Sequence, residues 1–264
     1  MVGPAETHWA EELARWAIPP EILASAPEPP WGFPPAFFRA PAEPEDSPSR
    51  RRALEALPPG GSVLDVGSGG GAACLALVPP AAQLVAVDET PAMLDMLGTS
   101  GLSLGVAVTT IVGRWPAIAD RVPSAEVVVC HHVLYNAADL GEFVLALSTH
   151  ATRRVVIEIT ERHPMVGLNH LWRHFHGVDR PEGPGVAEAL AVLAEVGIDA
   201  QVERFSRPPR WQARDAGLQV GMARRRLCLT PDADPEIECL LEPGYDLLST
   251  SAACIWWDCG RQGD

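Results

Sequence analysis

The sequence lacks lysine altogether. Its 20 basic residues are all arginine, set against 34 acidic residues, and the formal net charge is −14. Proteins that bind nucleic acids neutralise phosphate groups with clustered Lys and Arg side chains. The one basic cluster here, Arg224-Arg225-Arg226, lies in an acidic chain and is typical of a solvated helix face. We therefore predict that nucleic acid is not a partner.

Paired cysteines and long apolar runs are missing as well. The six cysteines include no C-x-x-C pair, and reduced cysteine in an apolar run behaves as a small core residue. No uninterrupted apolar stretch reaches the roughly 18 residues that a membrane span needs. The first residues show no charged segment followed by an apolar one, as a secretory signal would. These absences favour a cytoplasmic protein with no membrane partner.

Short β-branched runs alternate with helical stretches from residue 49 onward. Runs typical of buried parallel strands occur at 62–67, 83–88, 106–112, 126–130 and 154–160. Between them, residues 90–98 and 139–148 repeat apolar side chains at helical spacing. Further strands are expected at 198–206 and 251–259. The pattern predicts an α/β fold, a doubly wound, mostly parallel seven-stranded sheet with helices on both faces.

A glycine-rich turn follows the first predicted strand. The strand runs into Gly67-Ser68-Gly69-Gly70-Gly71, and Ala72 to Leu77 can open a helix. Glycines let the backbone turn sharply and approach a ligand closely, which suits a nucleotide-like cofactor at the carboxyl edge of a sheet. Asp88 ends the next strand, where a carboxylate can accept hydrogen bonds from both ribose hydroxyls. Alone, the glycine spacing fits NAD and S-adenosylmethionine (SAM) about equally.

Three further features favour SAM. The acid precedes the glycines, so that residues 65–71 read D-x-G-x-G-x-G; "VAVDETPAMLDML" follows at the second strand, and "EVVVCHHVLYNAADL" at the fourth. In this series the chain resembles the class I, Rossmann-like, SAM-dependent methyltransferases of the small-molecule type. The resemblance covers roughly residues 50–160. It implies SAM as cofactor and S-adenosylhomocysteine (SAH) as product, and it is nearly silent on the acceptor.

The resemblance also implies a set of cofactor residues. The loop residues, beneath the methionine part of SAM, are Asp65, Gly67, Ser68, Gly69 and Gly71. Asp88 holds the ribose with Glu89 beside it, and Met93 packs on the adenine. The family often has an acidic residue after the third strand, where this chain has Arg114 and Trp115. We expect Trp115 or the backbone around Arg114 to serve the adenine, with core packing as the alternative for Trp115.

Two adjacent histidines end the fourth predicted strand, which in the family borders the transferable methyl group. We expect His131 to contact the cofactor and His132 or Tyr135 to border the substrate, because successive strand side chains point to opposite faces. An acceptor atom with a proton to lose needs a general base. The candidates for this role are His132, Tyr135 and His163, followed by Glu158 and Glu161.

A third group of histidines raises the question of a metal. His170 and His174 share a helix face at i, i+4, a spacing that metal ligands use. His176 falls round the helix from them, and no cysteine or carboxylate is spaced to complete the ligand set locally. We predict a polar, aromatic-rich wall there and no metal.

The predicted domain organisation has two parts. Residues 1–48 form an N-terminal helix and a proline-rich cap segment with the aromatic side chains Trp31, Phe33, Phe37 and Phe38. A disordered linker would be poor in aromatics, so these either close over the cofactor or anchor the segment. Residues 49–264 form the SAM-binding methyltransferase domain, with substrate-side insertions at about 162–185 and 207–247.

These features predict an enzyme that transfers a methyl group from SAM to an O, N or C nucleophile of a small-molecule acceptor. Two alternatives are an NAD-dependent oxidoreductase and a SAM-binding protein without transferase activity. Methylation of nucleic acid is disfavoured by the charge. It is also disfavoured because the N/D-P-P-Y/F tetrapeptide of amino-group nucleic-acid methyltransferases is absent, the corresponding segment being Cys130-His131-His132-Val133.

Overall fold

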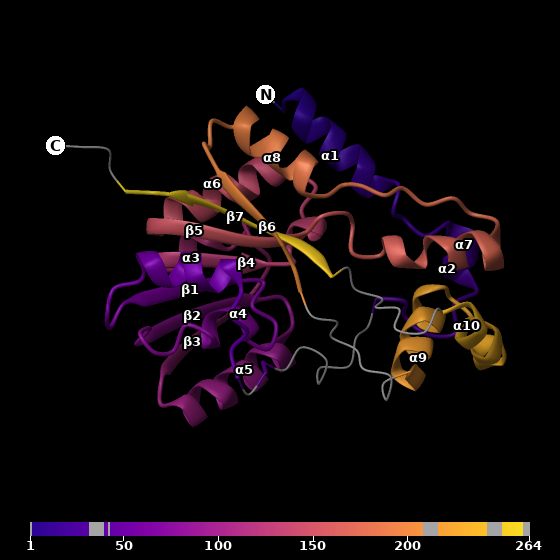
Figure 1. The fold of residues 1–264 in the computed structure, drawn as a ribbon, viewed down its shortest axis with the longest axis horizontal. Helices are drawn as coiled ribbons and strands as arrows, with labels where there is room; N and C mark the ends of the chain where they lie inside the picture. The colour runs from indigo at the N-terminus through magenta and orange to yellow at the C-terminus, as the bar shows by residue number, and fades with distance from the viewer. Residues whose placement is uncertain (1, 32–39, 42, 208–215, 242–249, 261–264) are drawn as a thin grey trace.

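One seven-stranded sheet forms the centre of the molecule. The computed structural model describes residues 2–31, 40–41, 43–207, 216–241 and 250–260. The strands are β1 (Ser62–Val66), β2 (Gln83–Asp88), β3 (Ala107–Val112), β4 (Ala125–His131), β5 (Ala151–Thr160), β6 (Gln201–Ser206) and β7 (Ser251–Asp258). Their order is β3-β2-β1-β4-β5-β7-β6 (Figure 1). The pairs among β1 to β5 are parallel, and β7 runs antiparallel to both β5 and β6. The predicted fold class is confirmed.

Helices cover both faces of this sheet. One face carries α1 (Pro4–Ala14), α6 (Leu140–His150) and α8 (Val186–Glu195). The other carries α3 (Pro48–Ala56), α4 (Ala72–Leu75) and α5 (Pro91–Leu104). Val128 of β4 joins the core under the first set and Val127 the core under the second, because alternate strand side chains point to opposite faces. Burial on both faces explains the continuous apolar run of β4.

Four further helices form a separate helical lobe. They are α2 (Pro20–Ala24), α7 (Asn169–His176), α9 (Ala216–Arg226) and α10 (Asp234–Leu240). The lobe has its own core, in which Leu171, Ala223 and Ile237 are fully buried. Its helices come from before β1, between β5 and β6, and between β6 and β7, and they lie beside the sheet (Figure 1). Short 3₁₀ turns occur at Ala119–Arg121, Leu134–Asn136, Val166–Leu168 and Pro231–Ala233.

The N-terminal segment is divided between the two parts of the molecule. Trp9 of α1 is buried against the sheet layer, and its indole N–H donates to the carbonyl oxygen of Ala137 over 2.7 Å. By contrast, Ile18 lies in the core of the helical lobe, beside α2. The expected cap therefore contributes to two layers, and Phe33, Phe37 and Phe38 lie outside the described residues.

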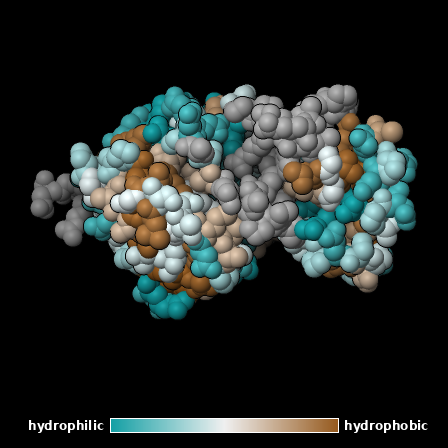
Figure 2. Space-filling model, turned by 90° about the horizontal axis from the view of Figure 1, so that it is seen from below, coloured by the Kyte–Doolittle hydropathy of each residue, from teal (hydrophilic) through white to brown (hydrophobic). Residues whose placement is uncertain are grey.

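The strand at 107–112 differs from its prediction as a buried strand. Among the described residues β3 pairs with β2 alone, and its side chains are exposed or half-buried. An edge strand lacks a neighbouring strand on one side, so its side chains are less buried than those of a central strand. Leu102, Leu104 and Val112 are exposed at this edge. Figure 2 views the molecule from below and shows apolar side chains among paler ones on the sheet part.

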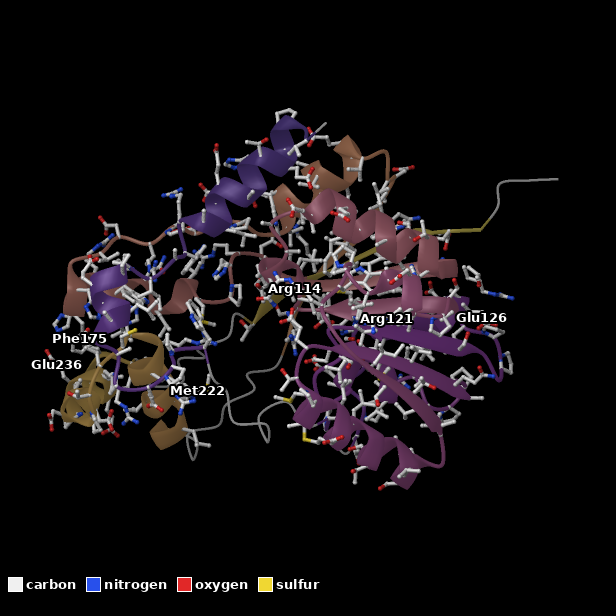
Figure 3. All side chains as sticks on the ribbon, turned by 180° about the vertical axis from the view of Figure 1, so that it is seen from behind. Arg114, Arg121, Glu126, Phe175, Met222 and Glu236 are labelled. Carbon is white, nitrogen blue, oxygen red and sulfur yellow. The ribbon has the colours of Figure 1, made fainter. Side chains whose placement is uncertain are left out.

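The carboxyl ends of the parallel strands face the helical lobe. Arg114, just after β3, lies on the side of the sheet toward the lobe residues Phe175 and Met222, whereas Glu126 at the start of β4 lies at the opposite end (Figure 3). Ligands of open α/β sheets bind outside the carboxyl ends of the strands. Among the described helices, none is long and apolar enough to cross a bilayer.

Candidate functional site

The glycine loop joins β1 to α4 in a conformation that glycine permits. Gly67, Gly69 and Gly71 have φ values of 71°, 50° and 86°, in the left-handed region where side chains are strained. A Cβ atom on Gly67 would also lie 2.3 Å from Val133 Cγ2. At this position both the backbone angle and the neighbour require glycine.

Two carboxylates hold this loop over the sheet edge. The buried side chain of Asp65 accepts a hydrogen bond from the backbone N–H of Cys74, at 3.2 Å. Burial raises the pKa of Asp65 to about 6, against the lowering effect of that bond. Asp88 accepts from the N–H of Gly69 through Oδ2 and from that of Thr90 through Oδ1, each at 2.8 Å. The loop and the end of β2 are thus fixed to one another.

The loop retains hydrogen-bonding capacity that a cofactor can use. A carboxylate offers about four acceptor positions, and the two backbone bonds leave two of them on Asp88 for ribose hydroxyls. The buried Ser68 Oγ has no hydrogen-bond partner among the described residues, and buried polar atoms normally have one. The residues present therefore fit a nucleoside-bearing cofactor.

The remaining predicted cofactor residues lie near the ends of β2 and β3. Of these, Trp115 lies in the core that α6 covers. Glu89 and Arg114 are exposed, 3.8 Å apart between Oε1 and Nε, and Met93 on α5 is buried. Trp115 is buried in the core, and its indole N–H donates to the carbonyl oxygen of Phe143 over 3.3 Å. The indole packs against α6, which favours core packing, the alternative given for Trp115.

The chain turns sharply between the two histidines. His131 is the last residue of β4 and lies opposite Glu158 in the register with β5. His132 has a φ of 60°, rare outside glycine, and its backbone N–H donates to the carbonyl oxygen of Glu158 over 2.7 Å. This turn directs the His132 ring to the Glu158 carboxylate, with Nε2 at 3.0 Å from Oε1.

A third residue, Arg207, completes this cluster from the end of β6. Its Nη1 lies 2.5 Å from His132 Nε2 and 3.2 Å from Glu158 Oε1. The side chains of Glu158 and Arg207 are 6% and 10% exposed. Burial disfavours the charged form of Glu158, but the hydrogen bond from His132 and the charges of His131, His132 and Arg207 bring its pKa well below the usual range. Arg207 was not predicted from the sequence, where its only signal is an arginine directly after a strand.

The hydroxyl of Tyr135 forms hydrogen bonds with Thr160 at the end of β5. Its hydroxyl accepts from the backbone N–H of Thr160 at 2.8 Å and lies 2.5 Å from Thr160 Oγ1. Burial raises the pKa of Tyr135, opposed by the bonds to Thr160. A hydroxyl engaged in this way is less suited than His132 to take an acceptor proton, and Tyr135 as a general base stays a prediction. Tyr135 fixes the end of β5.

His163 is likewise placed for packing. Its ring stacks on Trp16 with centroids 3.8 Å apart, and its Nδ1 accepts from the backbone N–H of Met165 over 3.2 Å. Burial, with the nearby charges of Arg180 and Arg226, lowers the pKa of His163 to about 3. A ring so weakly basic is a poor base near neutral pH. Of the three predicted bases, His132 alone keeps a carboxylate partner and a part-exposed ring.

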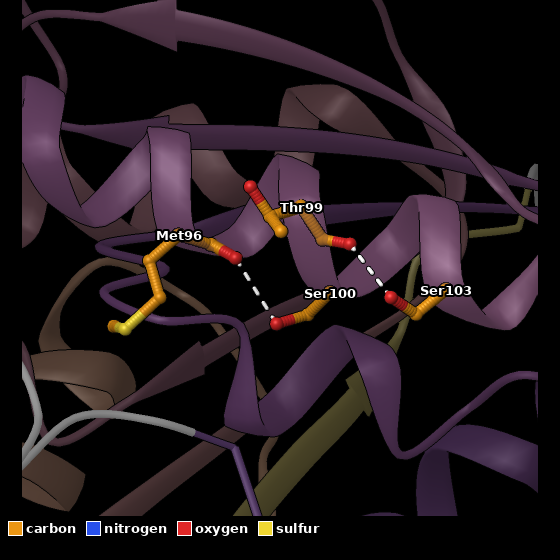
Figure 4. A pocket seen from close by; sticks show the side chains of 4 residues that line it. All are labelled: Met96, Thr99, Ser100 and Ser103. Carbon is orange, nitrogen blue, oxygen red and sulfur yellow. Dashed lines mark hydrogen bonds between the residues drawn. The ribbon is translucent and has the colours of Figure 1, made fainter.

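Two other groups of polar side chains lie outside this cluster. The histidines of α7 have separate partners: His174 Nε2 lies 2.8 Å from Glu236 Oε1, and His176 Nε2 lies 2.7 Å from the Leu227 carbonyl oxygen. A shallow hollow of about 360 Å³ on α5 is lined by Met96, Thr99, Ser100 and Ser103 (Figure 4). The hydroxyls of Ser100 and Ser103 donate to carbonyl oxygens of their own helix, so we assign no ligand to it.

The strand order separates two classes of nucleotide-binding sheet. Dinucleotide-binding folds have the order 3-2-1-4-5-6. Here an additional antiparallel strand, β7, lies between β5 and β6. This difference argues against the NAD-dependent alternative.

Comparisons with known proteins agree with this distinction. Residues 64–152 match the family model described as a methyltransferase domain. The YcgJ protein of Bacillus subtilis is similar in structure, with a TM-score of 0.54 and 18% identity over 81% of this chain and 99% of that one. A sarcosine dimethylglycine methyltransferase candidate from Galdieria sulphuraria has a TM-score of 0.52 and 14% identity, over 80% and 83% of the two chains.

A third similar structure concerns the conversion of a disulfide bond into a thioacetal group during echinomycin biosynthesis. Its TM-score is 0.54 at 14% identity, with 89% of each chain covered. A search of curated proteins finds no match. These likenesses show the fold, and the family match shows the domain. Residues 64–152 thus match a methyltransferase domain, and the sheet is arranged as in these structures, which gives the chain a class I, Rossmann-like fold.

Proposed function

We propose that the protein transfers a methyl group from SAM to an O, N or C nucleophile of a small-molecule acceptor. The observation that carries this proposal is the placement of two features at one sheet edge. The glycine loop, held by Asp88, follows β1, and the part-exposed His132, paired with the buried Glu158 of β5, follows the adjacent β4. This arrangement supports a cofactor position and a general base at neighbouring strand ends.

The cofactor side comprises the glycine loop, Asp88 and the residues around them. We propose that SAM is held by Asp65, Gly67, Ser68, Gly69, Gly71, Asp88, Glu89, Met93, His131 and the backbone around Arg114. When bound, SAM supplies a methyl group already activated on a sulfonium. The chain's own contribution is to hold this methyl group in line with the acceptor atom. The left-handed glycines and the free acceptor positions of Asp88 support this assignment.

The proposed acceptor side comprises His132, Glu158 and Arg207, with the helical lobe beside the sheet. We propose that the ring of His132 takes the proton that the acceptor loses. Glu158 orients that ring and stabilises the charge it gains, as a buried carboxylate does for histidine bases. We further propose that the insertions at about 162–185 and 207–247, with α2 from the N-terminal segment, enclose the acceptor.

Calorimetric titration tests the cofactor assignment. SAM and SAH are expected to bind, and NADH is not. Asp88→Ala should weaken SAH binding by about 100-fold or more, because two charge-assisted hydrogen bonds at about 1.5–3 kcal/mol each are lost. Asp95→Ala, an exposed aspartate on α5, is the control and should bind SAH normally. Binding of NADH with no affinity for SAM or SAH would overturn the proposal.

A second experiment separates transfer from binding alone. A metabolite pool is incubated with methyl-labelled SAM, and His132→Gln is compared with the wild type on any acceptor that takes up label. Loss of a general base is expected to slow transfer by about 10²–10⁴-fold, with SAH affinity unchanged. His8→Gln, an exposed histidine on α1, serves as the control. A protein that binds SAH but labels no metabolite is the non-catalytic alternative.

A further inference from the structure

Four side chains form a cluster where the sheet joins the helical lobe. This junction cluster consists of Trp16, His163, Trp172 and Arg180. The histidine follows β5 directly, and Trp172 lies on α7 in the core of the lobe. The ring of Tyr135 meets that of His163 edge-on, with centroids 5.2 Å apart. Since Tyr135 comes three residues after His132, the junction cluster borders the proposed acceptor side.

His163 offers a fixed hydrogen-bond donor at this place. Its Nδ1 accepts from the backbone N–H of Met165 over 3.2 Å, so the proton of the neutral ring is on Nε2. The ring plane is fixed by the stack on Trp16, in which the two planes are 16° apart. Among the described residues, no group accepts a hydrogen bond from Nε2. The buried ring therefore has a donor available for a ligand.

Arg180 is a cation whose partners are all neutral. Its Nη1 donates to the carbonyl oxygens of Ala17 and Arg15, at 2.8 and 3.4 Å. Its guanidinium carbon lies 4.1 Å from the ring centre of Trp172 and 5.8 Å from that of Trp16. No carboxylate pairs with Arg180 in the part of the chain that the structure describes. The two carbonyls account for Nη1 alone, and the buried Nε has no hydrogen-bond partner there.

The loop that carries Arg180 is held in place by its backbone. Asn169 Nδ2 donates to the carbonyl oxygens of Arg180 and Pro181, at 3.3 and 3.0 Å. At the other end of the loop, the indole N–H of Trp16 donates to the carbonyl oxygen of Gly183 over 2.6 Å. The guanidinium is thus positioned in advance of any ligand, which reduces the entropic cost of binding one.

The charge of the junction cluster is positive although the chain carries −14 overall. Burial, with the charges of Arg180 and Arg226, lowers the pKa of His163 to about 3, and burial also lowers the pKa of Arg180. Both shifts are those of a site where positive charge has no nearby anion to offset it. A guanidinium and an N–H group only donate hydrogen bonds, and a carboxylate only accepts them. A carboxylate therefore suits this cluster, and an ammonium group does not.

We propose that the junction cluster binds a carboxylate of the methyl acceptor, with Arg180 supplying the opposite charge and the Nε2–H of His163 a second hydrogen bond. Arg180 and His163 are then specificity-determining residues, which recognise the acceptor while His132 serves the atom that is methylated. The inference rests on the proposed function, since it assigns a chemical class to the acceptor of that same site. Acceptors without a carboxylate are expected to bind poorly.

The experiment uses acetate as the probe and acetamide, its neutral counterpart, as the control. The ring signals of His163 are followed by NMR of the ¹⁵N-histidine-labelled full chain, and His163→Phe assigns them. Acetate is expected to shift the Nε2 signal saturably and to raise the proton affinity of the ring about tenfold or more, because an anion offsets the charges near it. Acetamide should do neither. No saturable shift with acetate, or an equal response to both probes, overturns the proposal.

Variants of Arg180 show whether its charge carries the response. Arg180→Met keeps an apolar stem beside Trp172 and should weaken acetate binding about tenfold or more, because a charge-assisted hydrogen bond is lost. Arg173→Met, an exposed arginine of α7, is the matched control and should bind acetate as the wild type does. Thermal unfolding verifies that each variant is folded, and Arg180→Lys, which keeps the charge, should retain part of the affinity. Unchanged acetate binding in a folded Arg180→Met contradicts the proposal.

Two further measurements separate this inference from the proposed function. SAH titration is scored by itself: a protein that binds no SAH fails the proposed function, and one that binds SAH without responding to acetate fails only the inference. On an acceptor found by labelling, Arg180→Met should raise KM about tenfold and leave kcat nearly unchanged. A labelled acceptor that has no carboxylate would overturn the inference and leave methyl transfer established.

Discussion

The proposed cofactor side of the site is a glycine backbone loop held by carboxylates, whereas the proposed acceptor side is made of charged and aromatic side chains. Gly67, Gly69 and Asp88 interact through main-chain N–H groups within one stretch of sequence. His132, Glu158 and Arg207 come from three strand ends and meet through their side chains. The cofactor side thus constrains the backbone conformation, and the acceptor side constrains the charges of its side chains. Substitutions should therefore fail for different reasons on the two sides.

The largest effect is expected from Glu158→Gln on the acceptor side. It leaves Arg207 buried without its ion-pair partner, and breaking a buried pair costs roughly 3–5 kcal/mol in the free energy of unfolding. The control is Glu161→Gln, which breaks a more exposed pair with Arg204 and should cost about 1 kcal/mol or less. Urea unfolding at neutral pH measures both. Equal costs for the two variants would show that burial does not strengthen the Glu158 cluster.

The same variant has a pH signature. The pKa of Glu158 is lowered on folding, so its contribution is fully present above the unfolded value and is lost as pH falls toward the folded one. The stability difference between wild type and Glu158→Gln should therefore shrink as pH falls below about 4.5, the ordinary value. A difference that stays constant in acid would contradict the assignment of an ionised carboxylate.

Gly67→Ala tests the conformational constraint on the cofactor side. The added Cβ meets Val133 at 2.3 Å and forces a residue with a side chain to hold a φ of 71°. Strain of about 1–2 kcal/mol and overpacking of about 1–3 kcal/mol combine to roughly 2–5 kcal/mol. Gly60→Ala is the matched control, because its φ of 78° carries the strain with nothing within 4 Å of the Cβ. If thermal unfolding shows equal losses, the close approach of Val133 is not decisive.

His163 should make the stability of the protein depend on pH. Burial, with Arg180 and Arg226, lowers its pKa to about 3, so the unfolded chain binds a proton that the folded chain refuses. Stability is fully present above the unfolded pKa of about 6.5 and falls as pH drops toward 3. The loss reaches about 2 kcal/mol at pH 5. His163→Gln should remove this part of the slope in unfolding measured between pH 7 and 5, and an unchanged slope would contradict it.

The same difference decides what could be predicted from the sequence. Asp65, the glycines and Asp88 could be predicted as cofactor residues because a local motif carries both their spacing and their chemistry. The proposed acceptor side was only partly predictable: Arg207 lies 75 positions from His132, and no periodicity links them. Tyr135 and His163 were predicted as bases from position, but burial and the partners Thr160 and Trp16 decide their roles. Such contacts depend on tertiary packing.

The smallest effect is expected from Tyr135→Phe, which tests whether the acceptor side also contains purely structural groups. Removing the hydroxyl leaves the buried N–H of Thr160 without its acceptor, at a cost of about 1–2 kcal/mol in unfolding free energy. A double-mutant cycle with Thr160→Val should show coupling, because the two hydroxyls contact each other. Methyl transfer to any acceptor found by labelling should survive in the variant, unlike in His132→Gln. A loss of transfer as large as that of His132→Gln, with SAH binding intact, would show that Tyr135 is a catalytic residue. It would then have a role like that of His132.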